Sequence, residues 1–324
     1  MAKKKKKKKP TAPTPPVVLL PGVVIRSTGS WYRVRTEDGS IYECKLRGKF
    51  RIKGIKTTNP VAVGDRVSIS IEEDVGFIRE IADRRNYVLR KSVNLARRAH
   101  ILCANIDQAI ILFTVDQPVT TLGYVDRLLV TCEAYHIPAV ILFNKVDALD
   151  ATGQERLADF RRIYEQVGYP THTISATDPQ YADVVRELLR DKVSFLVGRS
   201  GAGKSTTVNL VEPDLQLKVG NISDFSGRGK HTTTFAEMHD LNFGGHIIDS
   251  PGFKEMVIFD FERADLSHYF PEMRARLHEC KFANCIHLSE PHCAIKTAVE
   301  SDEVPETRYH TYQNMLEEIE DPGW

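Results

Sequence analysis

A glycine-rich segment that ends in lysine and serine carries the clearest chemistry in this sequence. Its residues are Gly198, Arg199, Ser200, Gly201, Ala202, Gly203, Lys204, Ser205 and Thr206. Backbone N–H groups in such a segment surround phosphate oxygens, the lysine reaches the β- and γ-phosphates, and the serine hydroxyl binds Mg²⁺. Because an apolar run at 193–197 precedes the segment and a helical pattern follows it, we expect a phosphate-binding loop with Lys204 as a catalytic group.

A second segment predicts which base is bound. Asn144, Lys145, Val146 and Asp147 directly follow the apolar run at 139–143. A carboxylate at Asp147 can accept hydrogen bonds from N1–H and the exocyclic amine of guanine together, whereas adenine would leave it unpaired. Ser175 and Ala176, at the end of the next apolar run, match the backbone element that contacts guanine O6. Taken alone, these two residues would indicate only the end of a strand.

Two further segments are expected to respond to the γ-phosphate. Asp249 follows the apolar run at 245–248 and is expected to hold Mg²⁺ through water, while the N–H of Gly252 would meet the γ-phosphate. Threonines 232, 233 and 234 follow a glycine-rich basic run at 227–231, and Thr233 is the candidate that would complete the Mg²⁺ shell. We expect this first switch to be mobile without nucleotide.

The order of these segments along the chain is unusual. In an ordinary GTPase the phosphate loop comes first and the base-specifying tetrad comes late. Here the tetrad and Ser175 precede Gly198, and Asp249 comes last. This order predicts a circularly permuted domain, in which the segment at 249–253 runs directly into the C-terminal part of the chain.

Cysteine and histidine side chains near the C-terminus predict a metal site. Cys280, Cys285, His287 and Cys293 supply three thiolates and one imidazole, a closed tetrahedral set typical of structural zinc. The alternatives are His292 as a ligand, which would strain the chelate beside Cys293, and a cluster of buried free thiols. The remaining cysteines are scattered among apolar neighbours and are expected to be buried thiols: Cys44, Cys103 and Cys132. This usage suits a reducing compartment.

Short strand-like runs dominate the N-terminal part. Runs at 22–27, 31–36, 41–46, 66–71 and 76–81 are separated by turn signals and predict a five-stranded OB-type barrel, with an SH3-like barrel as the alternative. Basic and aromatic residues alternate here, as in a nucleic-acid groove, so we expect RNA contact; the alternative is a solvated face with core aromatics. They are Arg33, Arg35, Lys45, Arg47, Lys49, Arg51, Lys53 and Lys56, with Trp31, Tyr32, Tyr42 and Phe50.

The spacing of apolar residues along the sequence changes after residue 101. Apolar runs at 109–114, 139–143, 171–175, 193–197 and 245–249 alternate with helical patterns at 122–134, 154–166, 181–189 and from Gly203 onward. This alternation predicts a parallel sheet covered on both faces. Helical patterns at 266–278 and 306–319 flank the cysteine cluster. The expected organisation is a tail at 1–16, an OB barrel at 17–95, an α/β domain at 96–255 and a helical zinc domain at 256–324.

Bulk properties narrow the class further. A chain of 324 residues is longer than a single hydrophobic core usually supports, so more than one domain is expected. The net charge is +1. An unbroken lysine run at 3–9 and a proline-rich stretch at 10–16 predict a disordered tail, either solubilising or polyanion-seeking. No stretch is long enough to span a membrane, and no signal or transit peptide is evident. We therefore expect a cytosolic protein without a membrane partner.

Together the segments at 104–108, 144–147, 198–205, 227–234, 249–252 and 290–293 resemble the bacterial family of circularly permuted GTPases that assist maturation of the small ribosomal subunit. The resemblance implies an OB barrel, a permuted G domain and a zinc-binding C-terminal domain. It also implies GTP and Mg²⁺ as ligands, binding to the small (30S) subunit and its 16S rRNA, and hydrolysis stimulated by that particle. Nothing in the sequence demands more than a monomer. Ser250 stands where many members carry threonine.

Phe253 occupies the position at which classical GTPases place a water-orienting glutamine. A phenyl ring cannot orient water, so we expect slow intrinsic hydrolysis, with the missing group supplied by His231, by the ribosome or by both. His231 could instead pack on RNA or on the barrel. The other classes considered are an RNA-binding scaffold that holds nucleotide as a structural ligand and a P-loop ATPase, which Asp147 argues against.

Overall fold

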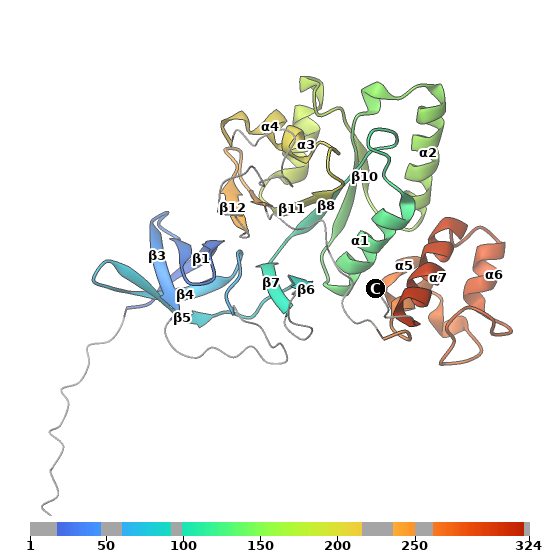
Figure 1. The fold of residues 1–324 in the computed structure, drawn as a ribbon, viewed down its shortest axis with the longest axis horizontal. Helices are drawn as coiled ribbons and strands as arrows, with labels where there is room; N and C mark the ends of the chain where they lie inside the picture. Colours follow the sequence, from blue (N-terminus) through green and yellow to red (C-terminus); the bar gives the residue numbers. More distant parts are fainter. Residues whose placement is uncertain (1–17, 47–59, 92–98, 216–235, 250–261, 321–324) are drawn as a thin grey trace, which may run out of the picture.

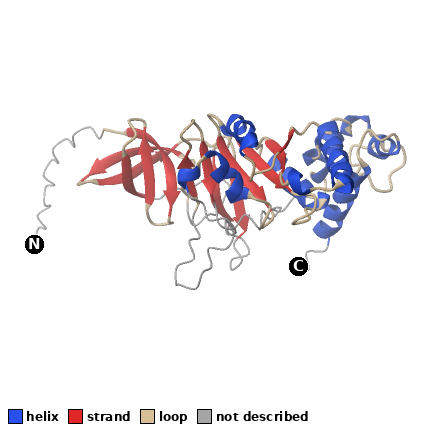
Figure 2. Cartoon of the chain, turned by 90° about the horizontal axis from the view of Figure 1, so that it is seen from above, coloured by secondary structure: helices blue, strands red, loops and turns tan. Residues whose placement is uncertain are grey.

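The structure, a computed structural model, describes residues 18–46, 60–91, 99–215, 236–249 and 262–320. Three parts follow one another along the long axis of the molecule (Figure 1). Figure 2 shows that strands form the first part, strands and helices share the middle, and helices alone form the last part. Among the described residues, no helix is long and apolar enough to cross a membrane.

The first part is a closed barrel. Its strands are β1 (Leu20–Ser27), β2 (Tyr32–Thr36), β3 (Ile41–Leu46), β4 (Arg66–Glu72) and β5 (Val75–Ile81). They pair in the order β1-β2-β3-β5-β4, β3 and β5 run parallel, and β4 returns to pair with β1. Alternate residues such as Val24, Val34 and Ile78 point into a shared core, as the period of two requires. The predicted OB-type barrel is confirmed.

The middle part is an α/β domain. Its strands are β8 (Gln108–Phe113), β9 (Ala139–Phe143), β10 (Thr171–Thr173), β11 (Val193–Gly198), β12 (Glu237–Asp240) and β13 (His246–Asp249). The order is β10-β9-β8-β11-β13-β12, in which only β12 is antiparallel to its neighbour. Ile111 and Phe113 of β8 enter one core cluster while Ile110 and Leu112 enter another. The sheet is therefore buried on both faces, as predicted.

Helices cover this sheet. They are α1 (Leu122–Ala134), α2 (Ala151–Gln166), α3 (Ala182–Leu189) and α4 (Lys204–Val211), with 3-10 turns η1 (Val146–Ala148), η2 (Pro179–Tyr181) and η3 (Pro213–Leu215). All four helices begin within a few residues of their predicted starts. Because the five parallel strands end on one edge of the sheet, the segments that follow them meet there.

Three strands were not predicted. β12 also pairs with β1 of the barrel, through Arg26 and Glu237, so that one 11-stranded sheet runs from the barrel into the α/β domain. Strands β6 (Tyr87–Lys91) and β7 (Ala99–Ala104) form a separate two-stranded sheet. β12 reads Glu-Met-His-Asp and so shows no apolar run. β6 and β7 each contain a short one, at 88–89 and 101–104, but the expected strands did not include them.

The last part is helical. Its elements are η5 (Leu266–Tyr269), α5 (Pro271–Arg274), η6 (Leu277–Glu279), α6 (Ala294–Glu300) and α7 (Glu306–Glu320). The predicted helix at 306–319 is confirmed as α7. The helical pattern predicted at 266–278 is divided into the three short elements η5, α5 and η6. The first break falls at Pro271, which has no N–H to continue the preceding turn and instead starts a new helix. Phe270, Tyr312 and Leu316 centre the core of this part.

Candidate nucleotide and metal sites

Asn144 lies where three segments meet at the carboxyl edge of the sheet. Its Nδ2 donates to the carbonyl of Ala202 over 2.8 Å, and its Oδ1 accepts from the N–H groups of Lys145 at 2.8 Å and Ala176 at 3.0 Å. The side chain is 3% exposed. One buried amide therefore fixes the tetrad, the glycine-rich loop and the Ser175 segment relative to one another, and these predicted residues are brought together.

The glycine-rich loop connects β11 to α4. Gly203 has φ +98°, and a Cβ there would lie 2.2 Å from Nδ2 of Asn144, so only glycine fits. The Lys204 ammonium donates to the carbonyls of Gly198 at 2.7 Å and Arg199 at 3.0 Å. Ser205 is buried on the first turn of α4. The arrangement presents a helix N-terminus and an ammonium at one place, as phosphate binding requires.

The residues predicted to specify the base follow β9 directly. Lys145 adopts a left-handed conformation with φ +65° and is followed by η1, which contains Val146 and Asp147. Asp147 is exposed, so its carboxylate is accessible to a base. Ser175 and Ala176 are buried, and the N–H of Ile174 bonds to the carbonyl of Phe143 over 2.8 Å, which holds the two strand ends together.

A short loop that sequence reasoning missed lies against both segments. We call residues 117–119 the strap. The Gln117 carbonyl accepts from Nζ of Lys145 over 2.9 Å, and the Val119 carbonyl accepts from Nη1 of Arg199. Pro118 lies 3.6 Å from the position that a Cβ on Gly201 would take. A proline after a strand is the only local signal, and it does not indicate these contacts.

Several predicted residues lie outside the described part of the chain. They are His231, Thr232, Thr233, Thr234, Ser250, Gly252 and Phe253, together with residues 1–16 and the basic segment at 47–59. Asp249 is the last residue of β13, so its backbone lies at the same edge of the sheet as the phosphate loop. Its role as a Mg²⁺ group stays a prediction.

The four predicted metal ligands come together in the C-terminal part. The ligand atoms of Cys280, Cys285, His287 and Cys293 all lie within 4.8 Å of one another. Nδ1 of His287 is 3.4 Å from Sγ of Cys293 and 3.6 Å from Sγ of Cys280. A tetrahedral site with metal–sulfur bonds of about 2.3 Å and metal–nitrogen bonds of about 2.1 Å has such edges of about 3.6 Å. The residues present therefore fit a four-coordinate metal ion.

Hydrogen bonds from side chains that are not metal ligands hold the loop that carries these ligands. The phenol of Tyr309 donates to the carbonyl of His287 over 2.6 Å, and that of Tyr312 donates to the carbonyl of Ile286 over 2.8 Å. The Glu290 carboxylate accepts from the N–H groups of Ile286 and Leu288. Burial lowers the pKa of His287, which favours the neutral imidazole that a metal requires.

The other three cysteines are buried, as expected. Burial raises the pKa of Cys44 and Cys132 to about 12 and raises that of Cys103 as well. These thiols are therefore protonated at neutral pH and act as small apolar side chains.

The aromatic residues of the barrel are either buried in its core or exposed on its surface. Tyr32 is 2% exposed and belongs to the core, and Tyr42 packs against it. Trp31, by contrast, is 38% exposed, and the Lys45 ammonium lies 4.3 Å from its ring centroid. Lys45 is also the register partner of Phe77 on β5.

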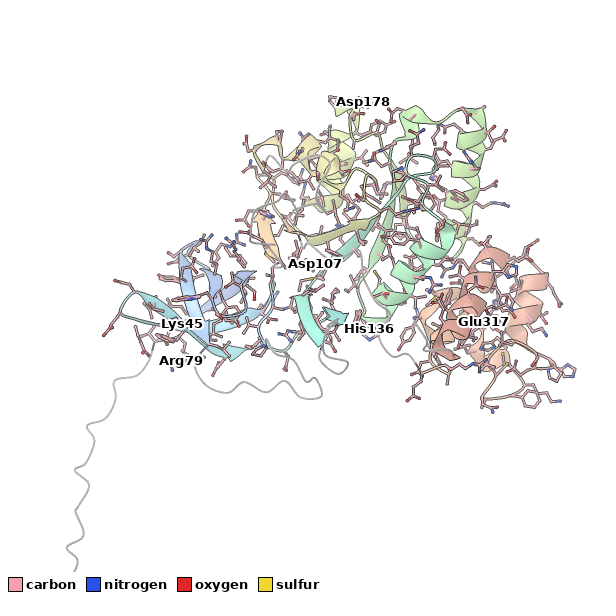
Figure 3. All side chains as sticks on the ribbon, viewed as in Figure 1. Lys45, Arg79, Asp107, His136, Asp178 and Glu317 are labelled. Carbon is pink, nitrogen blue, oxygen red and sulfur yellow. The ribbon has the colours of Figure 1, made fainter. Side chains whose placement is uncertain are left out.

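A second cation stands beside Phe77. The guanidinium of Arg79 lies 5.9 Å from the ring centroid of Phe77. Because Arg79 follows Phe77 by two residues on β5, it shares a face of the sheet with Phe77 and with the register partner Lys45. Lys45 and Arg79 are labelled in the barrel in Figure 3. We call Trp31, Lys45, Phe77 and Arg79 the aromatic–cation row. It combines ring faces with the charge of Lys45 and with the guanidinium of Arg79, which is itself paired with Glu72. Ring faces beside cations are the chemistry of a single-stranded nucleic-acid surface.

Two protein-family models match the chain. The model described as RsgA GTPase matches residues 81–259, and the model described as RsgA N-terminal domain matches residues 21–78. A protein of Flavobacterium johnsoniae named small ribosomal subunit biogenesis GTPase RsgA is 49% identical over 302 residues, which cover 92% of this chain and 93% of that relative. A relative of the same name from Bacteroides fragilis is 47% identical and covers 93% of this chain and 98% of its own.

Solved structures show the same architecture. The crystal structure of YjeQ from Thermotoga maritima matches with a TM-score of 0.75 and 32% identity, over 93% of this chain and 99% of that one. The structure of YloQ, described as a circularly permuted GTPase, matches with a TM-score of 0.73 and 29% identity, over 95% of this chain and 97% of that one.

Proposed function

The chain belongs to the RsgA GTPase family, and we propose that it binds the small ribosomal subunit, hydrolyses GTP there and assists late maturation of the particle. The observation that carries the nucleotide part is Asn144, whose amide joins the tetrad to the phosphate loop. The names of the relatives at 49% and 47% identity, which refer to small ribosomal subunit biogenesis, support the ribosomal part.

The described residues support a division of roles in the nucleotide site. Asp147 and the backbone at Ser175 and Ala176 select guanine, while the loop at 198–203 holds the phosphates. Lys204 neutralises charge on the β- and γ-phosphates when they bind. The buried hydroxyl of Ser205 and the carboxylate of Asp249 are the groups that would hold Mg²⁺, which supplies charge neutralisation on the phosphates.

Hydrolysis in this proposal depends on the partner particle. Phe253 stands where a water-orienting glutamine is usual, so the chain alone turns over slowly. Thr233 and His231 are the residues proposed to complete the site once GTP and the subunit are bound. A turnover rate of His231→Ala equal to wild type, measured with saturating small subunits, would remove His231 from the catalytic group.

We further propose that the metal held by the C-terminal ligands is zinc in a structural role. Three thiolates and one imidazole are the donor set that zinc prefers, and they leave no position open for chemistry. The carbonyls of His287 and Ile286 are already bonded to tyrosine hydroxyls, so the loop is shaped around the ligands. The ion would stabilise a domain too small to rely on its own core.

The aromatic–cation row is the surface we propose for contact with 16S rRNA. Exposed rings and cations bind unpaired bases and phosphates together. The sequence that continues from β3 adds further positive charge at Arg47, Lys49 and Arg51. The chain would act in the cytoplasm as a monomer, with an OB barrel at 17–95, a G domain at 96–255 and a zinc domain at 256–324.

An RNA-binding scaffold with nucleotide as a structural ligand is the alternative function. Sedimentation of the full chain with purified small subunits tests the ribosomal part. If GTP hydrolysis controls binding, the chain should sediment with the small subunit in the presence of a non-hydrolysable GTP analogue and sediment less with GDP. Equal pelleting with both nucleotides would favour the scaffold, and pelleting only with large subunits would contradict both proposals.

A further inference from the structure

A buried ion pair joins the G domain to the C-terminal domain. Nη1 of Arg308 on α7 donates to Oδ1 of Asp126 on α1 over 2.7 Å, and Thr311 donates to Oδ2 of the same carboxylate over 2.8 Å. Nε and Nη2 of the same guanidinium donate to the two carboxylate oxygens of Glu272. The Arg308 and Asp126 side chains are 1% and 0% exposed. In Figure 1, α1 lies beside the C-terminal helices.

Burial makes this contact different from the others between the two domains. A buried charge that loses its partner is strongly destabilising, so the pair resists sliding of α7 along α1. The same two helices also share an exposed pair, Arg127 with Glu318 at 2.5 Å. This pair is bidentate, since Nη2 of Arg127 also donates to Oε1 of Glu318, but it is open to solvent and therefore contributes less than the buried pair. The exposed pair therefore serves as an internal reference for the buried one.

The start of α1 reaches the nucleotide site. The helix begins at Leu122, separated from the end of the strap by two residues, and Thr121 caps it by accepting from the N–H of Tyr124. The strap carbonyls bind Lys145 of the tetrad and Arg199 of the phosphate loop. Burial raises the pKa of Tyr124 on the first turn of α1, and the Arg199 guanidinium opposes that rise.

We propose that Arg308 is a positioning residue for nucleotide binding. By holding Asp126, it fixes α1, and α1 in turn fixes the strap against Lys145 and Arg199. The C-terminal domain thus sets the affinity of the G domain for GTP and GDP through a route that is separate from the segment at 249–261. Because such coupling is reciprocal, bound nucleotide also tightens the attachment of the C-terminal domain.

The test compares three variants of the full chain: Arg308→Met, Thr311→Val and, as the matched control, Arg127→Gln. The measurements are the Kd for a fluorescent GDP analogue, kcat and KM for GTP, and the melting temperature. For a slow GTPase KM follows the substrate Kd. We expect Arg308→Met to raise Kd and KM about tenfold with kcat unchanged, and Thr311→Val to raise both about threefold. Arg127→Gln should match wild type.

A purely structural role would lower the melting temperature and leave Kd unchanged. That result in Arg308→Met would overturn the proposal, as would an equal rise of Kd in Arg127→Gln. If Arg308→Met fails to fold, Thr311→Val decides alone, because it removes one hydrogen bond and keeps the charges. An unchanged Kd in Thr311→Val would then contradict the coupling.

Discussion

The side-chain amide of Asn144 donates to the carbonyl of Ala202 across 58 residues of sequence. The base-specifying segment comes first in the chain and the phosphate loop comes later, yet the two are in contact at one edge of the sheet. Their strands, β9 and β11, flank β8. The permuted order therefore changes the connections between strands and leaves the arrangement of the site intact.

Replacing Asn144 with alanine should weaken binding of GTP and GDP alike. The change leaves the buried Ala202 carbonyl and the N–H of Ala176 without partners, at about 1–3 kcal/mol for each unsatisfied group. Titration with a fluorescent GDP analogue measures the effect, and Asn314→Ala on the exposed side of α7 is the control. An affinity equal to that of the control would show that Asn144 does not organise the site.

Asp147→Asn should remove the preference for guanine. The amide keeps one acceptor oxygen but replaces the other with an NH₂ group. One of the two guanine donors, N1–H or the exocyclic amine, then faces another donor, and a favourable hydrogen bond becomes a clash. We expect GTP affinity to fall at least a hundredfold while ATP affinity stays low. Competition of GTP and ATP against fluorescent GDP measures both. GTP binding that survives the substitution would place base recognition elsewhere.

Elemental analysis of the purified chain should find one zinc ion per molecule. Removing a ligand with Cys285→Ser should abolish zinc and lower the melting temperature, because binding of a structural metal contributes directly to folding. Cys132→Ser, which changes a buried thiol far from the cluster in sequence, should retain the ion. A full complement of zinc in Cys285→Ser would mean that His292 or another group is the fourth ligand.

Trp31→Ala should weaken binding to small subunits and to single-stranded 16S rRNA fragments. Loss of one stacking partner costs about 1–3 kcal/mol, or roughly 5- to 150-fold in affinity. Trp31→Phe should retain most of the affinity, and Ile41→Ala, another exposed apolar residue of the barrel, should change little. Intrinsic GTP hydrolysis should be the same in all three. Unchanged RNA affinity in Trp31→Ala would remove the aromatic–cation row from the interface.

The sequence was sufficient for features that depend on local pattern. The buried strands follow from apolar runs, and the phosphate loop, tetrad and metal ligands follow from fixed spacings. Contacts between distant residues have no such pattern. Arg308 and Asp126 are 182 residues apart, and neither has neighbours that indicate burial of a charge. The strap was missed for the same reason, since its carbonyls act through the backbone. The break at Pro271 could have been predicted from the proline itself.

Hydrolysis of GTP by the full chain, with and without purified small ribosomal subunits, tests the central claim most directly. If the particle completes the active site, the rate should rise by orders of magnitude on addition of small subunits. Large subunits should not replace them, and Lys204→Ala should abolish the stimulated rate. Equal rates with and without small subunits, at concentrations where the chain is bound, would contradict the proposal that this GTPase acts on the small subunit.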